Sequence, residues 1–384
     1  MKFAFVSQLD SKNVQSWSGT PFFMVQGLRE AGHSVKEIGP LHPPFPRTFK
    51  LLQKAYQALT GKCYDFSRHP MLAKALSKQA VAQMAGEQFD AVLCPSSIVC
   101  AGLDTDVPIV TWEDATFAGM VGYYPGKWQN FASATIRHGN QIQQASLSNA
   151  ALSVFSSEWA AQSALTNYTV EKKKVVVVPL GANLTEVPSQ ADVFAAITAR
   201  TQDKECRLLF IGVEWHRKGG DLVVETAMAL REKGINAFVE VVGCEPIGIM
   251  PDWVRTHGFV SKSTTEGREK LRLLLLNAHF LFVPSLAECY GLVFAEASAF
   301  GVPSIARATG GIPTAVQNGQ NGWALGVDEP ARTYAELIST QFNNAEIYKT
   351  TALRARQFYE ERLNWRAAVA SLEFLIEPLV PQRC

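Results

Sequence analysis

The sequence predicts an α/β protein with two domains, each a doubly wound parallel sheet covered by helices on both faces. Short runs rich in β-branched residues alternate with amphipathic helical patterns, which is the order of elements in parallel sheets. The strand runs are almost continuously apolar, as expected where both faces of a sheet are buried. The alternation starts again near Glu205, and a chain of 384 residues is too long for one ordinary core.

The first half of the chain opens with a predicted strand over residues 2–7. A helical pattern over 22–35 follows and ends at Gly32, the residue type most often found just after helices. Further strands are predicted over residues 89–95, 107–112, 151–157 and 173–180. The stretch between about Leu184 and Glu205 is rich in Ala, Gln, Asp and Thr, and it predicts a linker between the two domains.

The second half of the chain repeats the same rhythm. Its strands are predicted over residues 206–212, 236–243, 256–260, 278–285 and 302–307. In open parallel sheets, ligands bind beyond the carboxyl ends of the strands. Two such domains that face each other also form a cleft. The residues that carry function are therefore expected directly after strands.

Composition and charge argue against several classes of protein. A net charge of +1 argues against a broad nucleic-acid-binding surface. The seven cysteines are scattered without CxxC or zinc-site spacing, which is typical of a reducing cytosol and predicts a cytoplasmic protein. The opening residues MKFAFVS are too short for the core of a signal peptide. The most apolar run, 271–284, is interrupted by Asn277 and His279 and is shorter than the roughly 20 residues that span a bilayer.

Two loops after predicted strands have the composition of ligand-binding turns. Arg217 and Lys218 follow the strand over 206–212, with two glycines next to them. Arginine offers a planar fork of donors and lysine a compact charge, so this pair suits a diphosphate. Residues 309–313, TGGIP, contain two glycines that allow a close backbone approach to a ligand. A solvated basic turn and a plain glycine turn explain the same residues without a ligand.

Two glutamates, Glu288 and Glu296, lie in a segment, 284–305, that otherwise reads as protein interior. Glu288 is expected in the loop after the strand over 278–285, and Glu296 in a helix that starts near Gly291. The backbone N–H groups at that helix start are expected to form an anion site. Buried glutamates require partners, which a polyhydroxyl ligand would supply. The structural alternative is that Glu288 caps the helix and Glu296 pairs with a basic residue.

The segment ECYGLVFAE, Glu288–Glu296, resembles the E-x7-E motif of retaining glycosyltransferases of family four. Residues 282–325 resemble the core of that family almost throughout, and residues 210–221 resemble its phosphate-binding strand and loop. The resemblance covers nearly the whole chain and is strongest over 208–325. It implies the GT-B fold, in which two Rossmann-like domains face a central cleft.

The domains expected for this fold are an acceptor-side domain over 1–184 and a donor-binding domain over 185–365. A C-terminal helix over about 366–384 is expected to pack back on the first domain. The family often has an arginine directly after the strand glycine, where this chain has Val213. Arg217 is the natural substitute, because it adjoins Lys218.

The resemblance also implies roles for individual residues. Glu288 contacts hydroxyls of the donor sugar and is one of two predicted catalytic residues. Glu296 holds the ribose of the nucleotide, while Lys218 and Arg217 bind the diphosphate. The other donor-binding residues predicted by position are Gly19 in the turn after the first strand, Val260 near the base, and Cys289, Tyr290, Gly291, Leu292 and Val293 at the helix start.

Asp114 is the second predicted catalytic residue. Glu113 and Asp114 follow the strand over 107–112, and in many relatives a histidine or acidic residue here faces the sugar and the acceptor. Asp114 is preferred over Glu113, and an acidic pair that caps the next turn is the structural alternative. The triplet Asp104–Asp106 matches the metal-binding DxD of the other large glycosyltransferase fold. It precedes its strand and so falls at the wrong rim of the sheet, and no metal site is predicted.

Residues 43–78 form a basic stretch among Phe, Leu and Tyr. Its cations are Arg47, Lys50, Lys54, Lys62, Arg68, Lys74 and Lys78. Such a stretch can lie on an anionic membrane, or it can be the acceptor-side surface of a soluble domain.

The predicted function is a metal-independent, retaining glycosyltransferase. It moves a sugar from a nucleoside-diphosphate sugar, a co-substrate rather than a cofactor, to a hydroxyl of a glycan, lipid-linked glycan or small molecule. The expected setting is bacterial-type polysaccharide or glycoconjugate biosynthesis in the cytoplasm, with peripheral contact to the inner face of the membrane left open. Two alternatives remain: a nucleotide-sugar epimerase of the same fold, and a sugar-nucleotide-binding protein without turnover.

Overall fold

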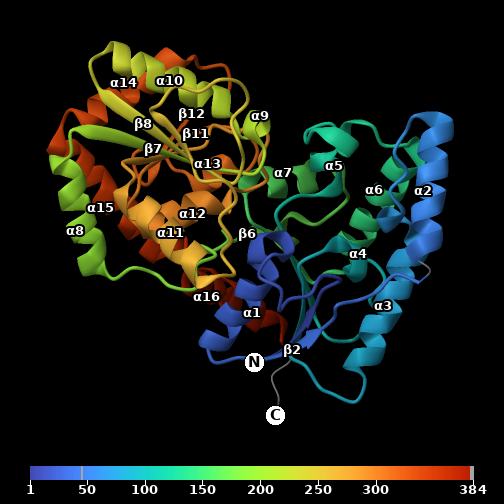
Figure 1. Cartoon of the computed structure of the whole chain (residues 1–384). Coiled ribbons are helices and arrows are strands. Elements are labelled where there is room, and N and C mark those ends of the chain that lie inside the picture. The colour runs from blue at the N-terminus through green and yellow to red at the C-terminus, as the bar shows by residue number, and fades with distance from the viewer. Residues whose placement is uncertain (45, 381–384) are drawn as a thin grey trace. The chain divides into compact units, whose positions relative to one another are not determined.

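The structure is a computed structural model that describes residues 1–44 and 46–380. It divides into two compact units. Figure 1 shows them with the chain coloured from blue at the N-terminus to red at the C-terminus. Unit 1 comprises Met1–Pro179 and the residues from Ala368 onward, and unit 2 comprises Leu180–Ala367. Each unit is built on one six-stranded sheet whose paired strands are all parallel. The predicted α/β class with two parallel sheets is therefore confirmed.

The sheet of unit 1 has the strand order β2-β1-β3-β4-β5-β6. Its strands are β1 (Lys2–Val6), β2 (Ser34–Ile38), β3 (Ala91–Cys94), β4 (Ile109–Glu113), β5 (Leu152–Phe155) and β6 (Val175–Val177). Its α-helices are α1 (Thr20–Glu30), α2 (Pro46–Thr60), α3 (Pro70–Met84), α4 (Ser97–Cys100), α5 (Phe117–Met120), α6 (Ser133–Asn149), α7 (Glu158–Asn167) and most of α16 (Trp365–Ile376). Its 3-10 turns are η1 (Ser16–Gly19), η2 (Phe66–Arg68), η3 (Gly126–Gln129), η4 (Lys172–Lys174) and η5 (Glu377–Leu379).

β1 lies between β2 and β3 and is buried on both faces. The side chains of Phe3–Val6 are all fully buried, although alternate residues of a strand point to opposite faces. Helices therefore cover both sides of this strand, as its continuous apolar run predicted. The helix that follows it, α1, ends at Glu30, and Gly32 adopts a φ of 86° shortly after, as predicted from the glycine.

The sheet of unit 2 has the strand order β12-β11-β10-β7-β8-β9. Its strands are β7 (Glu205–Ile211), β8 (Asn236–Val242), β9 (Val254–Thr256), β10 (Phe280–Phe282), β11 (Ser304–Arg307) and β12 (Gly322–Leu325). Its helices are α8 (Gln190–Gln202), α9 (Trp215–Lys218), α10 (Gly220–Glu232), α11 (Thr265–Asn277), α12 (Leu292–Ala299), α13 (Ile312–Ala315), α14 (Ala331–Phe342) and α15 (Ala345–Arg362).

The order of the strands in unit 2 reverses between β7 and β10. From β7 the chain builds β8 and β9 on one side, and then it crosses to place β10, β11 and β12 on the other side. At such a switch point the two loops after the strands diverge to opposite faces of the sheet, and ligands bind outside the carboxyl ends. The segments after β7 and β10 are therefore the first place to look for a site.

Two predicted elements differ from the structure. The linker predicted between about Leu184 and Glu205 contains α8, which begins with a capping box between Ser189 and Asp192. The polar composition concealed an amphipathic helix whose apolar residues, Val193 among them, pack into the core of unit 2. The strand predicted over 256–260 lies earlier, since β9 ends at Thr256 and Gly258 has a φ of 61°.

The strands β2 and β12 were not predicted. Each lies at the edge of its sheet, and their side chains are mostly only partly buried. Edge strands are short and polar enough to lack a continuous apolar run, so the pattern that identified the central strands is absent from them.

Candidate active site

The loops after β7 and β10 are in direct contact. The backbone N–H of Leu286 donates to the carbonyl of Arg217 at 2.7 Å. Gly219 has a φ of 82°, and a Cβ on it would lie 2.3 Å from the carbonyl oxygen of Pro284. Only glycine allows this approach. The basic loop and the glutamate loop are thus held together by their backbones at the switch point.

Lys218, Arg217 and Glu288 form one cluster in these loops. The Lys218 Nζ pairs with the Glu288 carboxylate. The Arg217 guanidinium donates to the carbonyl of Ala287 at 2.9 Å and lies 3.7 Å from the same Glu288 Oε2. The three side chains are largely buried, with exposed fractions of 13% for Lys218, 10% for Arg217 and 11% for Glu288. The structure therefore brings together the residues that were predicted to bind the diphosphate and the sugar.

Val213 does not share in this cluster. Its side chain is 61% exposed, directly after Gly212. Arg217 also pairs with Glu214 at 2.8 Å, so its guanidinium is held on two sides. Arg217 is thus an arginine whose guanidinium lies beside Glu288, and its substitution for the arginine expected at Val213 stays a prediction.

The helix α12 begins as predicted, at Leu292 after the N-cap Gly291. Gly291 has a φ of 90°, and a Cβ on it would lie 2.6 Å from the ring of Phe294. The first-turn N–H groups of a helix attract anions, and in α12 they belong to Leu292 and Val293. The carbonyl of Glu288 accepts from the N–H of Gly311 at 3.1 Å, so the TGGIP turn also reaches this loop.

Glu296 is buried in α12, with 4% of the residue exposed, and it pairs with Lys262. The sequence prediction left a basic partner for Glu296 as the structural alternative, and this ion pair corresponds to it. Lys262 itself was missed. The signal that could have found it is its place, two residues after Val260 in the segment that follows β9. Val260 is half-buried in the same segment.

Tyr290 and Cys289 turn their side chains away from the surface. The Tyr290 hydroxyl donates to the carbonyl of Leu180 at 2.9 Å. Burial raises the pKa of Tyr290 well above its ordinary value. Cys289 is also buried. Only the backbone of these two residues is therefore available for the anion site predicted from their position.

In unit 1, Gly19 ends a run of three residues with left-handed backbone. Trp17 has a φ of 46°, Ser18 of 56° and Gly19 of 85°. Such a conformation is strained in residues other than glycine, and it persists only where surrounding contacts hold it. One such contact is the Trp17 indole N–H, which donates to the Asp114 carboxylate at 3.2 Å. The loop after β1 and the loop after β4 are thus tied together through these residues.

Of the two acidic residues at the carboxyl end of β4, Glu113 is the last residue of the strand and faces the core, and Asp114 follows it and is partly exposed. The Glu113 carboxylate accepts from the N–H of Ser97 at 2.6 Å and from Gln143 Nε2 at 3.0 Å. Burial raises the pKa of Glu113, and the hydrogen bonds from Gln143 and Ser97 oppose this rise. Glu113 therefore has a structural role, which leaves Asp114 as the acidic residue at this strand end that reaches solvent.

The raised pKa of Glu113 predicts a pH-dependent stability. Its contribution is fully present below the unfolded value of 4.5 and is lost as the pH rises through the folded value. The free energy of unfolding of the unmodified protein, relative to Glu113→Gln, is therefore expected to be lower at about pH 8 than at about pH 5. Urea unfolding at the two pH values measures this, with the exposed Glu30→Gln as control. A difference that stays constant or grows with pH contradicts the assignment.

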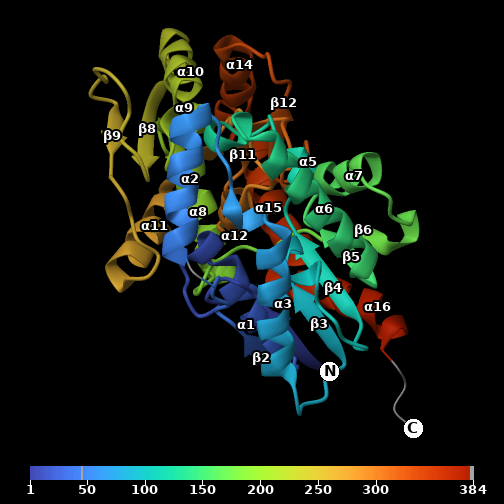
Figure 2. The same ribbon diagram turned by 90° about the vertical axis from the view of Figure 1, so that its right-hand side faces the viewer.

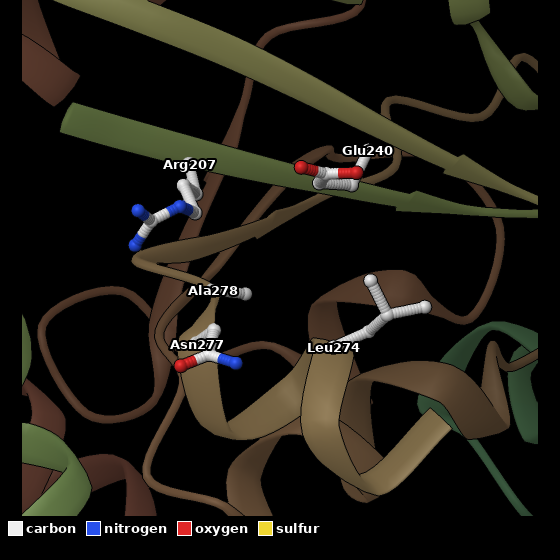
Figure 3. A pocket seen from close by; sticks show the side chains of 5 residues that line it. All are labelled: Arg207, Glu240, Leu274, Asn277 and Ala278. Carbon is white, nitrogen blue, oxygen red and sulfur yellow. The ribbon is translucent and has the colours of Figure 1, made fainter. Parts of the chain in front are cut away.

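A cavity of about 290 Å³ lies elsewhere in unit 2, lined by Arg207, Glu240, Leu274, Asn277 and Ala278. Figure 3 shows the Glu240 carboxylate on a strand across from Leu274 on a helix. Both charged groups already have partners: Arg207 pairs with Glu205 at 2.8 Å, and Glu240 with His257 at 2.7 Å. Arg207 is also near the amino end of β7, away from the loops of the switch point.

Asp104 and Asp106 lie before β4, at its amino end, as the sequence predicted. Within residues 1–44 and 46–380, no group of three or more His, Cys, Asp or Glu side chains is placed to hold a metal ion. In the same part of the chain, no helix has both the length and the hydropathy needed to cross a bilayer.

Comparison with known proteins yields one family model. It is described as "Glycosyl transferases group 1" and matches residues 205–344. The D-inositol 3-phosphate glycosyltransferase of Streptomyces avermitilis is 30% identical over 220 residues, 53% of this chain and 47% of that protein. The enzyme of the same name from Mycolicibacterium smegmatis is 26% identical over 215 residues, 53% of this chain and 49% of that protein. The chain thus spans about half the length of these curated relatives.

Solved structures resemble the chain over almost its full length. Sucrose-phosphate synthase from Thermosynechococcus elongatus superposes with a TM-score of 0.69, at 17% identity, over 98% of each chain. Anabaena HepE in complex with UDP and glucose gives 0.64 at 14% identity, over 98% of this chain and 100% of that one. WaaG, involved in lipopolysaccharide biosynthesis, gives 0.61 at 13% identity, over 97% of this chain and 99% of that one. These likenesses confirm the GT-B fold class.

Proposed function

We propose that this chain is a retaining glycosyltransferase of family four that transfers a sugar from a nucleoside-diphosphate sugar to an acceptor hydroxyl. The observation that carries the proposal is the cluster of Arg217, Lys218 and Glu288 beside the start of α12, at the switch point of the sheet. Cations and helix amides suit a diphosphate, and buried carboxylates suit hydroxyl groups. The matched family model over 205–344 supports the same assignment.

In the proposed complex, Glu288 accepts from hydroxyls of the donor sugar and Glu296 from hydroxyls of the ribose. Lys218 then shares its charge between Glu288 and the diphosphate, with Arg217 beside it. Lys262, the partner of Glu296, is added to the set of residues that respond to the nucleotide. The structure of Anabaena HepE contains UDP and glucose, so uridine is the first base to test.

The chemistry assigned to the chain is mainly positioning and charge stabilisation. As the bond to the diphosphate breaks, negative charge develops on the leaving oxygen, and Arg217, Lys218 and the first-turn N–H groups of α12 stabilise it. Holding donor and acceptor in line with each other accounts for several kcal/mol of the barrier. In unit 1, Asp114 is assigned to the acceptor or sugar and Gly19 to the donor phosphates. The sugar keeps its anomeric configuration, as the family resemblance implies.

The experiment that tests this function is a thermal-shift screen against UDP-, GDP- and ADP-sugars, followed by transfer assays. A ligand at about 100 times its dissociation constant adds about 2.7 kcal/mol of stability. The expected result is one stabilising donor and transfer of its sugar to a polyhydroxyl or lipid-linked acceptor with retention. Conversion of the donor without any acceptor indicates the epimerase alternative. Saturable binding without turnover on a broad acceptor panel indicates a binding protein.

Transfer is expected to persist after exhaustive EDTA treatment, because Arg217, Lys218 and α12 already provide positive potential where the diphosphate leaves. The control is the same assay with magnesium restored, which corrects for magnesium bound to free nucleotide. Strict dependence on added manganese, abolished by Asp104→Ala or Asp106→Ala, contradicts the metal-independent mechanism.

The basic stretch also has a surface that suits a membrane. The helix α2 runs along the outside of unit 1 (Figure 2), and Leu51 and Leu59 on it are 68% and 86% exposed. Since an α-helix turns by about 100° per residue, Leu51, Lys54 and Leu59 lie next to one another on one side of α2. An exposed apolar stripe beside lysines is typical of helices that lie on anionic bilayers. Peripheral contact of α2 with the inner face of the membrane is therefore part of the proposal.

Co-sedimentation with vesicles that contain phosphatidylglycerol tests this contact. Binding is expected to weaken at high salt and to fall at least about tenfold in the double variant Leu51→Gln/Leu59→Gln. Ile249→Gln removes a fully exposed apolar side chain from unit 2 and serves as the control. Equal binding of all three proteins, or no binding at all, assigns α2 to the surface of a soluble domain.

A further inference from the structure

Arg68, the last residue of η2, lies on aromatic rings without a hydrogen-bond acceptor of its own. Its guanidinium carbon is 5.0 Å from the ring centre of Phe117 and 5.8 Å from that of Trp128. No residue of the described ranges accepts a hydrogen bond from it or forms an ion pair with it within 4.0 Å. The side chain is partly exposed. Its guanidinium N–H donors are therefore not used by a described residue of the protein.

The carboxylates nearest to Arg68 are occupied by other donors. Asp65 accepts from Lys127 Nζ at 2.9 Å and from the Ser67 hydroxyl at 2.6 Å. Glu113 accepts from Ser97 and Gln143, as described above. Burial lowers the pKa of Arg68, while the charges of Asp65 and Glu113 act in the opposite direction. The protein thus partly removes this cation from water. The nearby carboxylates attract it through their charge, but none of them accepts a hydrogen bond from it.

The aromatic platform under Arg68 is rigid. A Cβ on Gly139 of α6 would lie 2.3 Å from the Phe117 ring, so this ring is packed tightly against α6. The N–H of Phe117 donates to Gln143 Oε1 at 3.1 Å, and the next N–H donates to the Tyr168 hydroxyl at 2.9 Å. Phe117 is the first residue of α5 and follows Asp114 by three residues. Arg68 therefore lies against the start of the helix that follows the partly exposed Asp114.

A partly desolvated guanidinium without a protein acceptor leaves its N–H donors to water or to a ligand, and a ligand with oxygen acceptors gains from displacing that water. A phosphate or carboxylate does so, because its oxygens match the planar fork of arginine with two parallel hydrogen bonds. We infer that Arg68 binds an oxyanion group of the acceptor, so that the acceptor is a phosphorylated or carboxylated hydroxyl compound. That this oxyanion belongs to the acceptor rests on the proposed function, whereas the binding of an oxyanion at Arg68 does not.

The first test measures binding at Arg68 by itself. The probe is inorganic phosphate at constant ionic strength, and the readout is the indole N–H resonance of Trp128, assigned by its loss in Trp128→Phe. This local signal separates Arg68 from the phosphate groups expected at Lys218. A saturable shift is expected for the unmodified protein and for Arg47→Gln, which removes an exposed arginine of the same unit.

In Arg68→Gln the affinity for phosphate is expected to fall at least about tenfold, since the charge and the fork are both lost. Arg68→Lys keeps the charge but lacks the planar fork of donors, so its affinity for phosphate is expected to lie between those of the unmodified protein and Arg68→Gln. If Arg68→Gln does not fold, Arg68→Lys is used in its place. The same titration with acetate distinguishes a preference for phosphate from one for carboxylate. Absence of a saturable shift in the unmodified protein, or equal affinity in Arg68→Gln, overturns the site. Saturation only above physiological phosphate, with no effect of Arg68→Gln, marks an adventitious ion only.

The second test measures selectivity among acceptors. Hexose 6-phosphates, hexuronates and the corresponding neutral hexoses are compared as acceptors with the donor found in the screen. Arg68→Gln is expected to raise KM at least about tenfold for the anionic acceptors while leaving kcat and the neutral acceptors unchanged. Equal loss on neutral and anionic acceptors reduces Arg68 to a structural residue. If no acceptor reacts while phosphate still binds at Arg68, the proposed function fails and the anion site remains.

Discussion

Replacing Lys218 with methionine is expected to lower kcat/KM by about 10²–10³, with a fall in kcat as well as a rise in KM. In the proposed mechanism the lysine stabilises the departing diphosphate more than the bound one, so its loss is expected to affect the transition state. Methionine is the appropriate replacement because the stem of Lys218 packs over Gly212, where a Cβ would lie 2.7 Å from Lys218 Cγ. Initial rates at saturating and limiting donor separate the two constants.

Lys218→Met also leaves the Glu288 carboxylate without its nearest cation, and this defect must be separated from catalysis. The double variant Lys218→Met/Glu288→Gln removes the unpaired charge, so it is expected to recover stability in urea unfolding without recovering activity. Lys233→Met, an exposed lysine at the end of α10, controls for the loss of one charge in unit 2. Full kcat/KM in Lys218→Met refutes the assignment of the diphosphate to this loop.

Glu296→Gln is expected to weaken the binding of the nucleoside diphosphate by about 10- to 100-fold, because charge-assisted hydrogen bonds of about 1.5–3 kcal/mol to the ribose are lost. Calorimetry with the diphosphate of the donor's own nucleoside measures this. The ion pair with Lys262 offers a purely structural account of the same glutamate. That account predicts an equal loss in Lys262→Met.

Ligand variants separate these two accounts. With the 2′,3′-dideoxy form of the nucleotide, the ribose cannot donate to Glu296, so the unmodified protein and Glu296→Gln are expected to bind it almost equally. The difference between the two nucleotides isolates the pairwise term, as in a double-mutant cycle. A defect in Glu296→Gln that is the same for both nucleotides contradicts the ribose role.

The sequence predicted those parts of the fold that are fully buried. Central strands such as β1 and β10 are continuous apolar runs because both faces are covered, and their pattern needs no partner to be recognised. The start of α12 could also be predicted, since a glycine before an apolar helical run marks it locally. Edge strand β2 and helix α8 depend on a few contacts with distant segments, which leave little trace in composition.

The candidate site shows the same division. Glu288 and Lys218 follow their strands directly, so sheet topology alone predicts that they meet. The pairing of Glu296 with Lys262 depends on how far the segment after β9 reaches toward α12, and sequence spacing does not encode that reach. The bond between Trp17 and Asp114 likewise depends on a left-handed run at residues whose types do not favour it.

Two ion pairs of the candidate site, Lys218–Glu288 and Lys262–Glu296, bear on which ligands the site would select. Lys218 pairs with Glu288, and Lys262 pairs with Glu296, so each of the two glutamates already has a cation as its partner. A lone phosphate that draws Lys218 away removes the nearest cation of Glu288, leaves it with the Arg217 guanidinium at 3.7 Å, and supplies no hydroxyl donor. A free sugar offers hydroxyls to Glu288 but no anion to the lysine. Under the proposed function, a molecule that carries both groups supplies an anion to the lysine and hydroxyls to the glutamates. We therefore expect the internal pairs to favour a complete nucleoside-diphosphate sugar over either of its halves.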